Sequence, residues 1–321
     1  MPALPDDPMI CFAHVSYQLQ ERLAARAAGP ASFTVRSAAE LKARIGEADI
    51  LVISGLWRDE LLARAARLRF IQSIGAGTDQ FGRAALGARG IRLASASGVN
   101  AAAVAEHAMA LLLALARRLP EARDNQHRRH WRGMIGDFAG REDELGGKTL
   151  LVIGLGRIGG RLARLAKAFD MRVIGVRRDP AGGANGADEV HPLDLLPALL
   201  PAADAVALTC PLTPQTEGLI GVDALARMRK SAWLINVARG RCVDEAALVA
   251  AIGEGRIAGA GIDVTAEEPL AATSPLWGMA NVLVTPHTAG ETRRYEDNLL
   301  DILTENLAHL RAGSTLRNQI L

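Results

Sequence analysis

Three glycines at the junction of a strand-like run and a helix-like run constrain this fold more than any other feature. Residues 149–153 ("TLLVI") form an apolar, β-prone run, and residues 157–169 have apolar side chains at helical spacing. Gly154, Gly156 and Gly159 lie at the junction. A strand that turns tightly into a helix predicts a βαβ unit, and a series of such units predicts a parallel sheet with helices on both faces.

Strand-like and helix-like runs alternate in two series. The first series has strand-like runs at 9–13, 31–35, 49–54, 69–74 and 90–95, with helical spacing at 38–48 and 58–68. The second has strand-like runs at 149–154, 171–176, 203–209, 231–237, 259–264 and 281–285. We therefore predict an α/β protein with two doubly wound parallel-sheet domains. A Rossmann domain at 101–287 is inserted in a flavodoxin-like substrate domain made of 1–100 and 288–321.

Two long helices and one polar segment complete the expected organisation. Residues 100–122 predict a helix that is apolar on more than one face, so we expect it to be buried against the other domain or a second subunit. The polar segment 123–149 is interpreted as a solvated surface rather than a nucleic-acid patch. Residues 291–310 predict a final amphipathic helix.

The composition excludes several classes of protein. The formal net charge is +2 and aromatic residues make up 4% of the chain, which disfavours binding to nucleic acid or to an anionic membrane. The chain has three cysteines, which are widely spaced and form no CxxC pair: Cys11, Cys210 and Cys242. We therefore expect neither a metal site nor a disulfide framework. The N-terminus does not resemble a signal peptide, and the apolar run 108–116 is too short to span a bilayer. We expect a cytoplasmic protein.

The glycine turn predicts a dinucleotide site. The stretch Gly154, Gly156, Arg157, Ile158 and Gly159 has the GxGxxG spacing, which lets backbone approach a pyrophosphate at a helix N-terminus. The motif by itself is a weak signal, and the strand before it and the helix after it strengthen the prediction.

The end of the next strand indicates which dinucleotide is bound. An NAD site usually carries an acidic residue there, but this strand ends in Arg177 and Arg178. A guanidinium pair suits a ribose 2′-phosphate, so we expect NADP(H) to be favoured over NAD(H). In the alternative interpretation both arginines are ordinary surface charges and Asp179 binds the ribose.

Several motifs in order resemble the D-isomer-specific 2-hydroxyacid dehydrogenases, the family of the glyoxylate/hydroxypyruvate reductases. The resemblance covers almost the whole chain. It rests on "SIGAGTDQF" (73–81), "GVNAAAVAEHAMALLLALARR" (98–118), the glycine turn, "CPLTPQTEGLI" (210–220), "LINVARGRCVDEAALVAAI" (234–252), "GAGIDVTAEEPL" (259–270) and "VLVTPHTAG" (282–290).

The resemblance implies three catalytic residues, Arg239, Glu268 and His287. The chemistry suits these types, because reduction of a 2-oxo acid needs a proton donor and a cation for the carboxylate. Histidine titrates near neutral pH, a carboxylate can orient it, and a planar guanidinium can hold both carboxylate and carbonyl oxygen. Each also has a plainer interpretation, as a turn cap, a loop acid or a backbone-bonding histidine. The adjacent Glu267 leaves the register of the glutamate open by one residue.

Further residues follow from the same resemblance. The backbone around Ala76 and Gly77 is expected to bind the substrate carboxylate, although a simple left-handed turn would also explain the glycines. Asp263 and Val237 are expected beside the nicotinamide, and Cys210, Pro211 and Thr216 along the coenzyme. His107 is interpreted as a packed residue of the long helix. The family implies a homodimer through the coenzyme domain, for which the apolar helix 101–118 is suited.

The expected reaction is reduction of a small 2-oxo acid, with glyoxylate or hydroxypyruvate as first candidates, to the D-2-hydroxy acid. The expected catalytic cleft is the crevice between the two domains. One alternative is a relative that oxidises formate or phosphite, and another is a corepressor-like protein that senses the dinucleotide. The chain as printed lacks the long N-terminal extension of formate dehydrogenases and ends soon after its last expected helix, so we expect neither. Trp57 and Trp131 either restrict the substrate pocket or stabilise the core.

Overall fold

The structure is a computed structural model that describes residues 4–26 and 29–321. It divides into two compact units, which are described separately below. Unit 1 comprises Met1–Asn100 together with Thr292–Leu321, and unit 2 comprises Ala101–Glu291. The chain returns to unit 1 after Glu291, whereas the sequence led us to expect the return after residue 287.

The sheet of unit 1 consists of five parallel strands. They are β1 (Ile10–Ala13), β2 (Ser32–Val35), β3 (Ile50–Ile53), β4 (Phe70–Ser73) and β5 (Arg92–Ala94), in the order β2-β1-β3-β4-β5. Each strand lies within a run that the sequence predicted. The strands are largely apolar on both faces because helices cover both, as is usual for parallel sheets.

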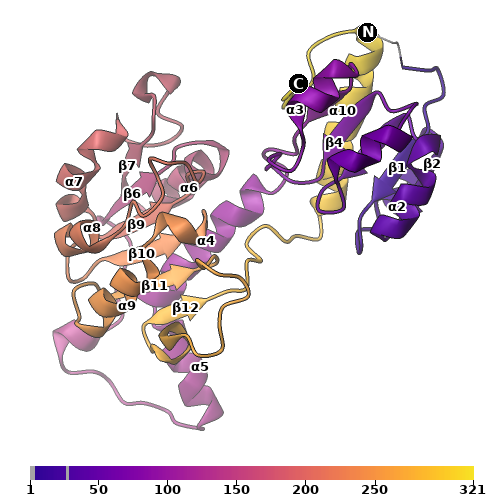
Figure 1. Ribbon diagram of the computed structural model, residues 1–321. Coiled ribbons are helices and arrows are strands. Elements are labelled where there is room, and N and C mark those ends of the chain that lie inside the picture. The colour runs from indigo at the N-terminus through magenta and orange to yellow at the C-terminus, as the bar shows by residue number, and fades with distance from the viewer. Residues whose placement is uncertain (1–3, 27–28) are drawn as a thin grey trace. The chain divides into compact units, whose positions relative to one another are not determined.

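The last helix of the chain completes unit 1. Helix α10 (Tyr295–Ala312), the yellow helix in Figure 1, packs together with α1 (Leu19–Ala24) on one face of this sheet. The Tyr295 hydroxyl donates to the Ile74 carbonyl over 2.8 Å. The other face carries α2 (Ala38–Arg44) and α3 (Arg83–Ala88). The expected helix at 58–68 is instead the 3-10 turn η2 (Asp59–Arg64), whose Leu61 and Leu62 are both buried in the core.

The sheet of unit 2 has seven parallel strands in the order β12-β11-β10-β9-β6-β7-β8. The chain order reverses where β6 lies between β7 and β9, and ligands of such sheets bind at that point, outside the carboxyl ends of the strands. Six of the strands follow the predicted runs. β8 was not predicted because it is a short, half-buried edge strand with the sequence "EVH". The strands are β6 (Thr149–Ile153), β7 (Arg172–Val176), β8 (Glu189–His191), β9 (Ala205–Leu208), β10 (Trp233–Asn236), β11 (Gly259–Ile262) and β12 (Val282–Val284).

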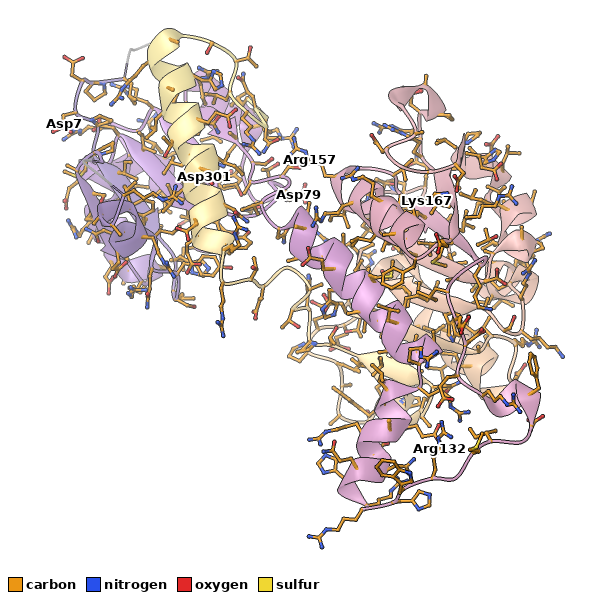
Figure 2. All side chains as sticks on the ribbon, turned by 180° about the vertical axis from the view of Figure 1, so that it is seen from behind. Asp7, Asp79, Arg132, Arg157, Lys167 and Asp301 are labelled. Carbon is orange, nitrogen blue, oxygen red and sulfur yellow. The ribbon has the colours of Figure 1, made fainter. Side chains whose placement is uncertain are left out.

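Helices cover both faces of this sheet (Figure 1). Helices α4 (Ala101–Ala116) and α6 (Arg157–Ala168) pack on one face, and α7 (Leu196–Leu199), α8 (Val222–Arg227) and α9 (Glu245–Gly253) pack on the other. Helix α6 is amphipathic, and its Lys167, which is labelled in Figure 2, forms an ion pair with Asp188 at 2.7 Å. The prediction of two doubly wound parallel-sheet domains is thus confirmed.

The single helix expected at 100–122 is two helices. α4 ends at Ala116, Arg118 has the left-handed φ of 48°, and α5 (Leu119–His127) begins one residue later. Pro120 explains the break, because its ring cannot continue a preceding helix but suits a first turn. The buried apolar side of α4 packs on α6, β10 and β11 of its own unit.

The described residues contain neither a membrane-spanning helix nor a cluster of metal ligands. Within residues 4–26 and 29–321 there is no helix of the length and apolarity needed to cross a membrane. In the same part of the chain, no group of three or more His, Cys, Asp or Glu side chains is placed to hold a metal ion.

Candidate active site

The glycine turn after β6 has the geometry that its spacing predicted. Gly154 has a φ of 99°, and a Cβ atom there would lie 2.6 Å from the Cα of Cys210. A Cβ on Gly159 would lie 2.2 Å from the Gly154 carbonyl oxygen, so this glycine lets α6 pack against the turn. A Cβ on Gly156, by contrast, would meet nothing within 4 Å. The middle glycine therefore faces open space at the N-terminus of α6, where a phosphate could approach the backbone.

A cavity of about 820 Å³ opens beside this turn. It lies outside the carboxyl ends of β6, β7 and β9, where the strand order reverses. The volume falls in the range of pockets that hold small molecules and cofactors. Its wall includes seven of the residues that the sequence assigned to the coenzyme, namely Gly154, Gly156, Arg177, Arg178, Cys210, Pro211 and Thr216.

The other five assigned residues do not line this cavity. Arg157, Ile158 and Gly159 form the first turn of α6, behind the glycine turn. Val237 and Asp263 directly follow β10 and β11, and both are buried. They belong to the neighbouring stretch of the same sheet edge.

Positively and negatively charged side chains both lie on the rim of the cavity. The Arg177 guanidinium donates to the carbonyls of Gly182 and Gly183 over 2.8 and 3.0 Å, and so braces the turn after β7. Arg178 and Asp179 are exposed on the cavity wall. The Asp179 carboxylate accepts from the Ala181 amide over 3.0 Å. Arg177 is thus bonded to the Gly182 and Gly183 carbonyls, whereas Arg178 is not.

Arg239 lies in the turn that follows β10. Asn236, at the end of that strand, fixes the turn by accepting from the Ala238 amide at 3.0 Å and donating to the Arg239 carbonyl at 3.1 Å. Gly240 permits the turn to touch the next loop, because a Cβ there would lie 1.9 Å from the Thr265 carbonyl oxygen. The Arg239 side chain is exposed at this edge.

Asp263 organises the turn that carries His287. Its carboxylate is 2% exposed and accepts from the amides of Thr288 and Ala289 at 2.9 and 3.0 Å. It also accepts from the Thr285 hydroxyl at 2.6 Å, and its backbone carbonyl accepts from the His287 amide at 2.8 Å. The sequence assigned Asp263 a place beside the nicotinamide; the structure adds this network.

Sequence reasoning missed two members of that network. His107 of α4 lies with its Nε2 atom 2.9 Å from the Thr285 hydroxyl and 3.6 Å from the Asp263 carboxylate. The sequence predicts only that His107 packs within the helix, and it indicates no role for Thr285. The available signal was a histidine in the middle of an apolar helix, since a polar side chain there needs a partner.

His287 and Glu268 form a hydrogen-bonded pair. The His287 Nδ1 atom lies 2.8 Å from the Glu268 carboxylate, and both side chains are partly exposed. The other Glu268 oxygen accepts from the Thr265 amide at 3.2 Å, which orients the carboxylate. Glu268, rather than the adjacent Glu267, is the residue that the structure pairs with the histidine. His287 also has a left-handed φ of 56°, an uncommon value for a non-glycine residue and one that is often found at functional sites.

The three side chains follow three neighbouring strands. β10, β11 and β12 are adjacent and parallel, so their carboxyl ends meet at one edge. Arg239 follows β10, Glu268 lies in the loop after β11, and His287 follows β12. An imidazole oriented by a carboxylate can transfer a proton, and a guanidinium at the same edge can bind a carboxylate.

The residues expected to bind the substrate carboxylate lie in unit 1. Ala76 and Gly77 are exposed in the loop after β4, and the Ser73 hydroxyl contacts the Gly75 and Gly77 carbonyls over 3.0 and 3.3 Å. Neither Gly75 nor Gly77 has a left-handed φ, so a left-handed turn does not explain these glycines.

The two tryptophans considered for the substrate pocket have opposite environments. Trp57 is 1% exposed and packs on Phe81, so it stabilises the core of unit 1. Trp131 is 97% exposed, in the segment after α5 of unit 2.

Comparison with known proteins identifies the family. Residues 109–289 match the family model described as "D-isomer specific 2-hydroxyacid dehydrogenase, NAD binding domain". The glyoxylate/hydroxypyruvate reductase B of Yersinia enterocolitica is 38% identical over 284 residues, which are 87% of this chain and 86% of that protein. The D-3-phosphoglycerate dehydrogenase of Archaeoglobus fulgidus is 37% identical over 262 residues, which are 81% of this chain. This chain spans only about half the length of that protein, 49%.

A solved structure agrees with these matches. The D-isomer specific 2-hydroxyacid dehydrogenase family protein of Aeromonas salmonicida is 31% identical, with a TM-score of 0.85. The alignment covers 98% of this chain and 99% of that chain. The glycine turn, the His287–Glu268 pair and Arg239 therefore occur in a chain that has the sequence and the fold of this oxidoreductase family. The chain belongs to the D-isomer specific 2-hydroxyacid dehydrogenases.

Proposed function

We propose that this protein reduces a small 2-oxo acid to the D-2-hydroxy acid with a reduced nicotinamide coenzyme. The observation that carries the proposal is the 2.8 Å contact between His287 and Glu268, at the sheet edge that also bears Arg239. A histidine held by a carboxylate is suited to give a proton to the forming hydroxyl group, and this is a requirement of carbonyl reduction.

The coenzyme would be held by the glycine turn and the wall of the 820 Å³ cavity. The fit is supported by the open space at Gly156 and by the left-handed φ of Gly154, a conformation that few other residues adopt at low cost. When bound, the coenzyme supplies the hydride. Val237 and Asp263 remain our assignments for the nicotinamide end.

Each catalytic residue has a role that its chemistry supports. His287 donates a proton from Nε2 to the substrate oxygen, while Nδ1 faces Glu268. Glu268 fixes the ring orientation and balances the charge of the imidazolium form. Arg239 binds the substrate carboxylate and carbonyl oxygen through its planar fork, and it stabilises the charge that develops on oxygen. We further propose that backbone amides around Ala76 and Gly77 donate hydrogen bonds to the substrate carboxylate.

The coenzyme preference that we propose is NADP(H) over NAD(H). Two cationic side chains at the end of β7 favour a 2′-phosphate. Because Arg177 already donates to the Gly182 and Gly183 carbonyls, we assign the phosphate contact mainly to Arg178. Asp179, on the same wall, is the group that would favour NAD(H) instead.

The names of the relatives indicate two substrate classes. One class is glyoxylate or hydroxypyruvate, and the other is a phosphorylated glycerate. We propose the unphosphorylated acids, because the chain matches 86% of the Yersinia reductase and only 49% of the Archaeoglobus dehydrogenase. The alternatives of a formate or phosphite oxidase and of a dinucleotide sensor receive no support from the His287–Glu268 pair, since neither requires proton transfer to a carbonyl.

Steady-state coenzyme oxidation against a panel of 2-oxo acids tests the proposal. We expect turnover of glyoxylate or hydroxypyruvate, and a higher kcat/KM with NADPH than with NADH. Equal or better rates with NADH would overturn the assignment of Arg177 and Arg178. Coenzyme binding without turnover of any 2-oxo acid would favour the sensor.

We also propose that the protein is a homodimer through unit 2. The segment after α5 presents large apolar side chains to solvent, with Trp131, Met134 and Phe138 exposed by 97, 101 and 86%. Monomeric proteins rarely expose such a group of side chains. This segment, rather than α4, is therefore the surface that we assign to the second copy.

A further inference from the structure

Helix α4 brings a histidine to the end of β11. A Cβ atom on Gly261 of that strand would lie 2.9 Å from the Cβ of Leu111, so helix and strand approach as closely as a glycine permits. His107 precedes Leu111 by one helical turn and therefore lies on the same face of α4. Asp263 follows Gly261 by two positions, on the same side of the sheet. This close packing accounts for the approach of the His107 ring to the Asp263 carboxylate.

His107, Thr285 and Asp263 form a chain of hydrogen bonds with a defined direction. The Thr285 hydroxyl donates to the Asp263 carboxylate over 2.6 Å. A hydroxyl has one proton, so the Thr285 oxygen can only accept from the His107 Nε2 atom, which lies 2.9 Å away. Nε2 therefore carries a hydrogen atom. The 3.6 Å from Nε2 to the Asp263 carboxylate is too long for a direct hydrogen bond, so Thr285 connects the two.

The far end of this chain is the turn that holds His287. The Asp263 carboxylate accepts from the Thr288 and Ala289 amides at 2.9 and 3.0 Å, and the Asp263 carbonyl accepts from the His287 amide at 2.8 Å. One residue thus binds three consecutive amides. His287 has a left-handed φ of 56°, a conformation that persists only where the surroundings hold it. The orientation of the Asp263 carboxylate therefore controls where the His287 ring lies.

We propose that His107 is a positioning residue for the proton transfer by His287. It fixes the Thr285 hydroxyl, which restrains the Asp263 carboxylate, and that carboxylate fixes the turn of the proton donor. His107 acts through the intervening residues and gives no proton to the substrate. The assignment rests on the proposed function, in which His287 is the proton donor. Misplacement of a reacting group by about 1 Å can cost 10²-fold in rate, so a restraint of this kind is large enough to matter.

Steady-state reduction of hydroxypyruvate by NADPH tests the proposal with two substitutions of His107. His107→Leu removes the donor, so kcat should fall by ~10–10²-fold. KM for hydroxypyruvate should stay near the wild-type value, because Arg239 lies on a separate turn that Asn236 fixes. His107→Gln places an amide N–H near the position of Nε2 and should restore most of kcat. An unchanged kcat in His107→Leu, or a loss that His107→Gln does not restore, would overturn the proposal.

A double-mutant cycle with Thr285 tests whether the two residues act as one chain. Thr285→Val keeps the side-chain shape and removes the hydroxyl, so it should lower kcat as His107→Leu does. The double variant should then lose no more than the poorer single variant, because either substitution already breaks the chain. Losses that multiply would mean that the two residues act independently and would overturn the proposal. Since Thr285→Val leaves α4 intact, it also provides the test if His107→Leu does not fold.

His309 provides a matched control. It also lies on a helix, α10, and its Nδ1 atom is 2.8 Å from the Ser314 hydroxyl, but both residues belong to unit 1. His309→Leu therefore removes a comparable contact between a histidine and a hydroxyl. This variant should retain the kcat of the wild type. An equal loss of kcat in His309→Leu and His107→Leu would assign the effect to general destabilisation and would overturn the proposal.

Amide hydrogen exchange measures the restraint without coenzyme or substrate. In His107→Leu, peptide 285–291 should exchange faster than in the wild type, while α9 on the other face of the sheet should be unchanged. His107→Gln should exchange at the wild-type rate. Unchanged exchange in His107→Leu would overturn the inference whatever the activity. Faster exchange in a protein that reduces no 2-oxo acid would count against the proposed function, and it would still support the restraint of the turn by His107.

Discussion

At the scale of single residues, His287 combines two constraints. Its side chain faces Glu268, and its backbone has a left-handed φ of 56°. The φ follows from the short turn that Asp263 fixes through the amides of Thr288 and Ala289. Any replacement must accept this conformation, which Asn tolerates better than Ala does. A substitution to Ala would thus combine a chemical effect with a conformational one.

Arg239 provides the sharpest residue-scale prediction. Replacement by Lys keeps the charge but removes the planar fork, so Arg239→Lys should lower kcat/KM for 2-oxo acids by ~10²–10³-fold, as the loss of an oxyanion donor does. Coenzyme affinity should change little, because Arg239 does not line the coenzyme cavity. Steady-state kinetics and coenzyme titration measure the two quantities.

A control variant lies two residues further along the same turn. Arg241 is exposed and pairs with Glu217, away from the proposed chemistry. Arg241→Lys should therefore retain the kcat/KM of the wild type. Equal losses in the two variants would mean that the turn, rather than the Arg239 fork, is responsible.

At the scale of elements, the regular strands were predictable from the sequence. Buried parallel strands are continuous apolar runs, and the runs at 49–54 and 149–154 could be read directly. The edge strand β8 was missed because it is half-buried and polar. The break between α4 and α5 was missed because apolar spacing continues across Arg118, although Pro120 carried the signal.

The candidate site was predictable only in part, for a physical reason. Arg239, Glu268 and His287 were found because each belongs to a local motif after a strand. The contacts of His107 with Thr285 and with Asp263 join distant segments, and no spacing along the chain indicates them. They depend on which strands are neighbours and on how α4 packs, which a single sequence does not specify.

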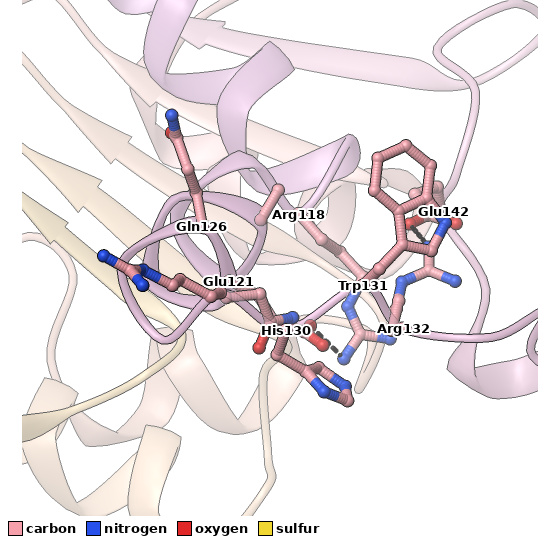
Figure 3. A pocket seen from close by; sticks show the side chains of 10 residues that line it. Arg118, Glu121, Gln126, His130, Trp131, Arg132 and Glu142 are labelled. Carbon is pink, nitrogen blue, oxygen red and sulfur yellow. Dashed lines mark hydrogen bonds and ion pairs between the residues drawn. The ribbon is translucent and has the colours of Figure 1, made fainter.

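The segment after α5 provides the element-scale prediction. A cavity of about 570 Å³ lies beside it, and Figure 3 shows Trp131 near the ion pairs of Arg118 with Glu121 and of Arg132 with Glu142. If this segment binds a second copy, the double substitution Trp131→Ala and Phe138→Ala should convert a dimer to a monomer. Light scattering after gel filtration measures the mass.

A matched control for that experiment is Trp277→Ala. Trp277 is also an exposed tryptophan of unit 2, at 57%, but it lies in the 3-10 turn η8 (Pro275–Gly278), outside the proposed interface. This variant should remain dimeric. A wild-type protein that is monomeric at all concentrations would contradict the interface.

At the scale of the whole molecule, the order of segments along the chain determines which of the two units is a single continuous segment. Unit 2 is one continuous segment, Ala101–Glu291, whereas unit 1 needs both ends of the chain. The buried pair of Asn306 with Gln72, at 2.9 Å, ties α10 to β4 across more than two hundred residues. The cavity beside the glycine turn and the three proposed catalytic side chains all belong to the continuous unit.

Proton donation by His287 is tested most directly by comparing wild-type protein with His287→Asn in the reduction of hydroxypyruvate by NADPH. Asn tolerates the left-handed backbone and can still donate to Glu268, but it lacks the Nε2 proton. We expect a D-hydroxy acid product from the wild type and a loss of ~10²–10⁴-fold in kcat for the variant, with coenzyme binding retained. Turnover by His287→Asn close to that of the wild type, or an L product from the wild type, would contradict this expectation.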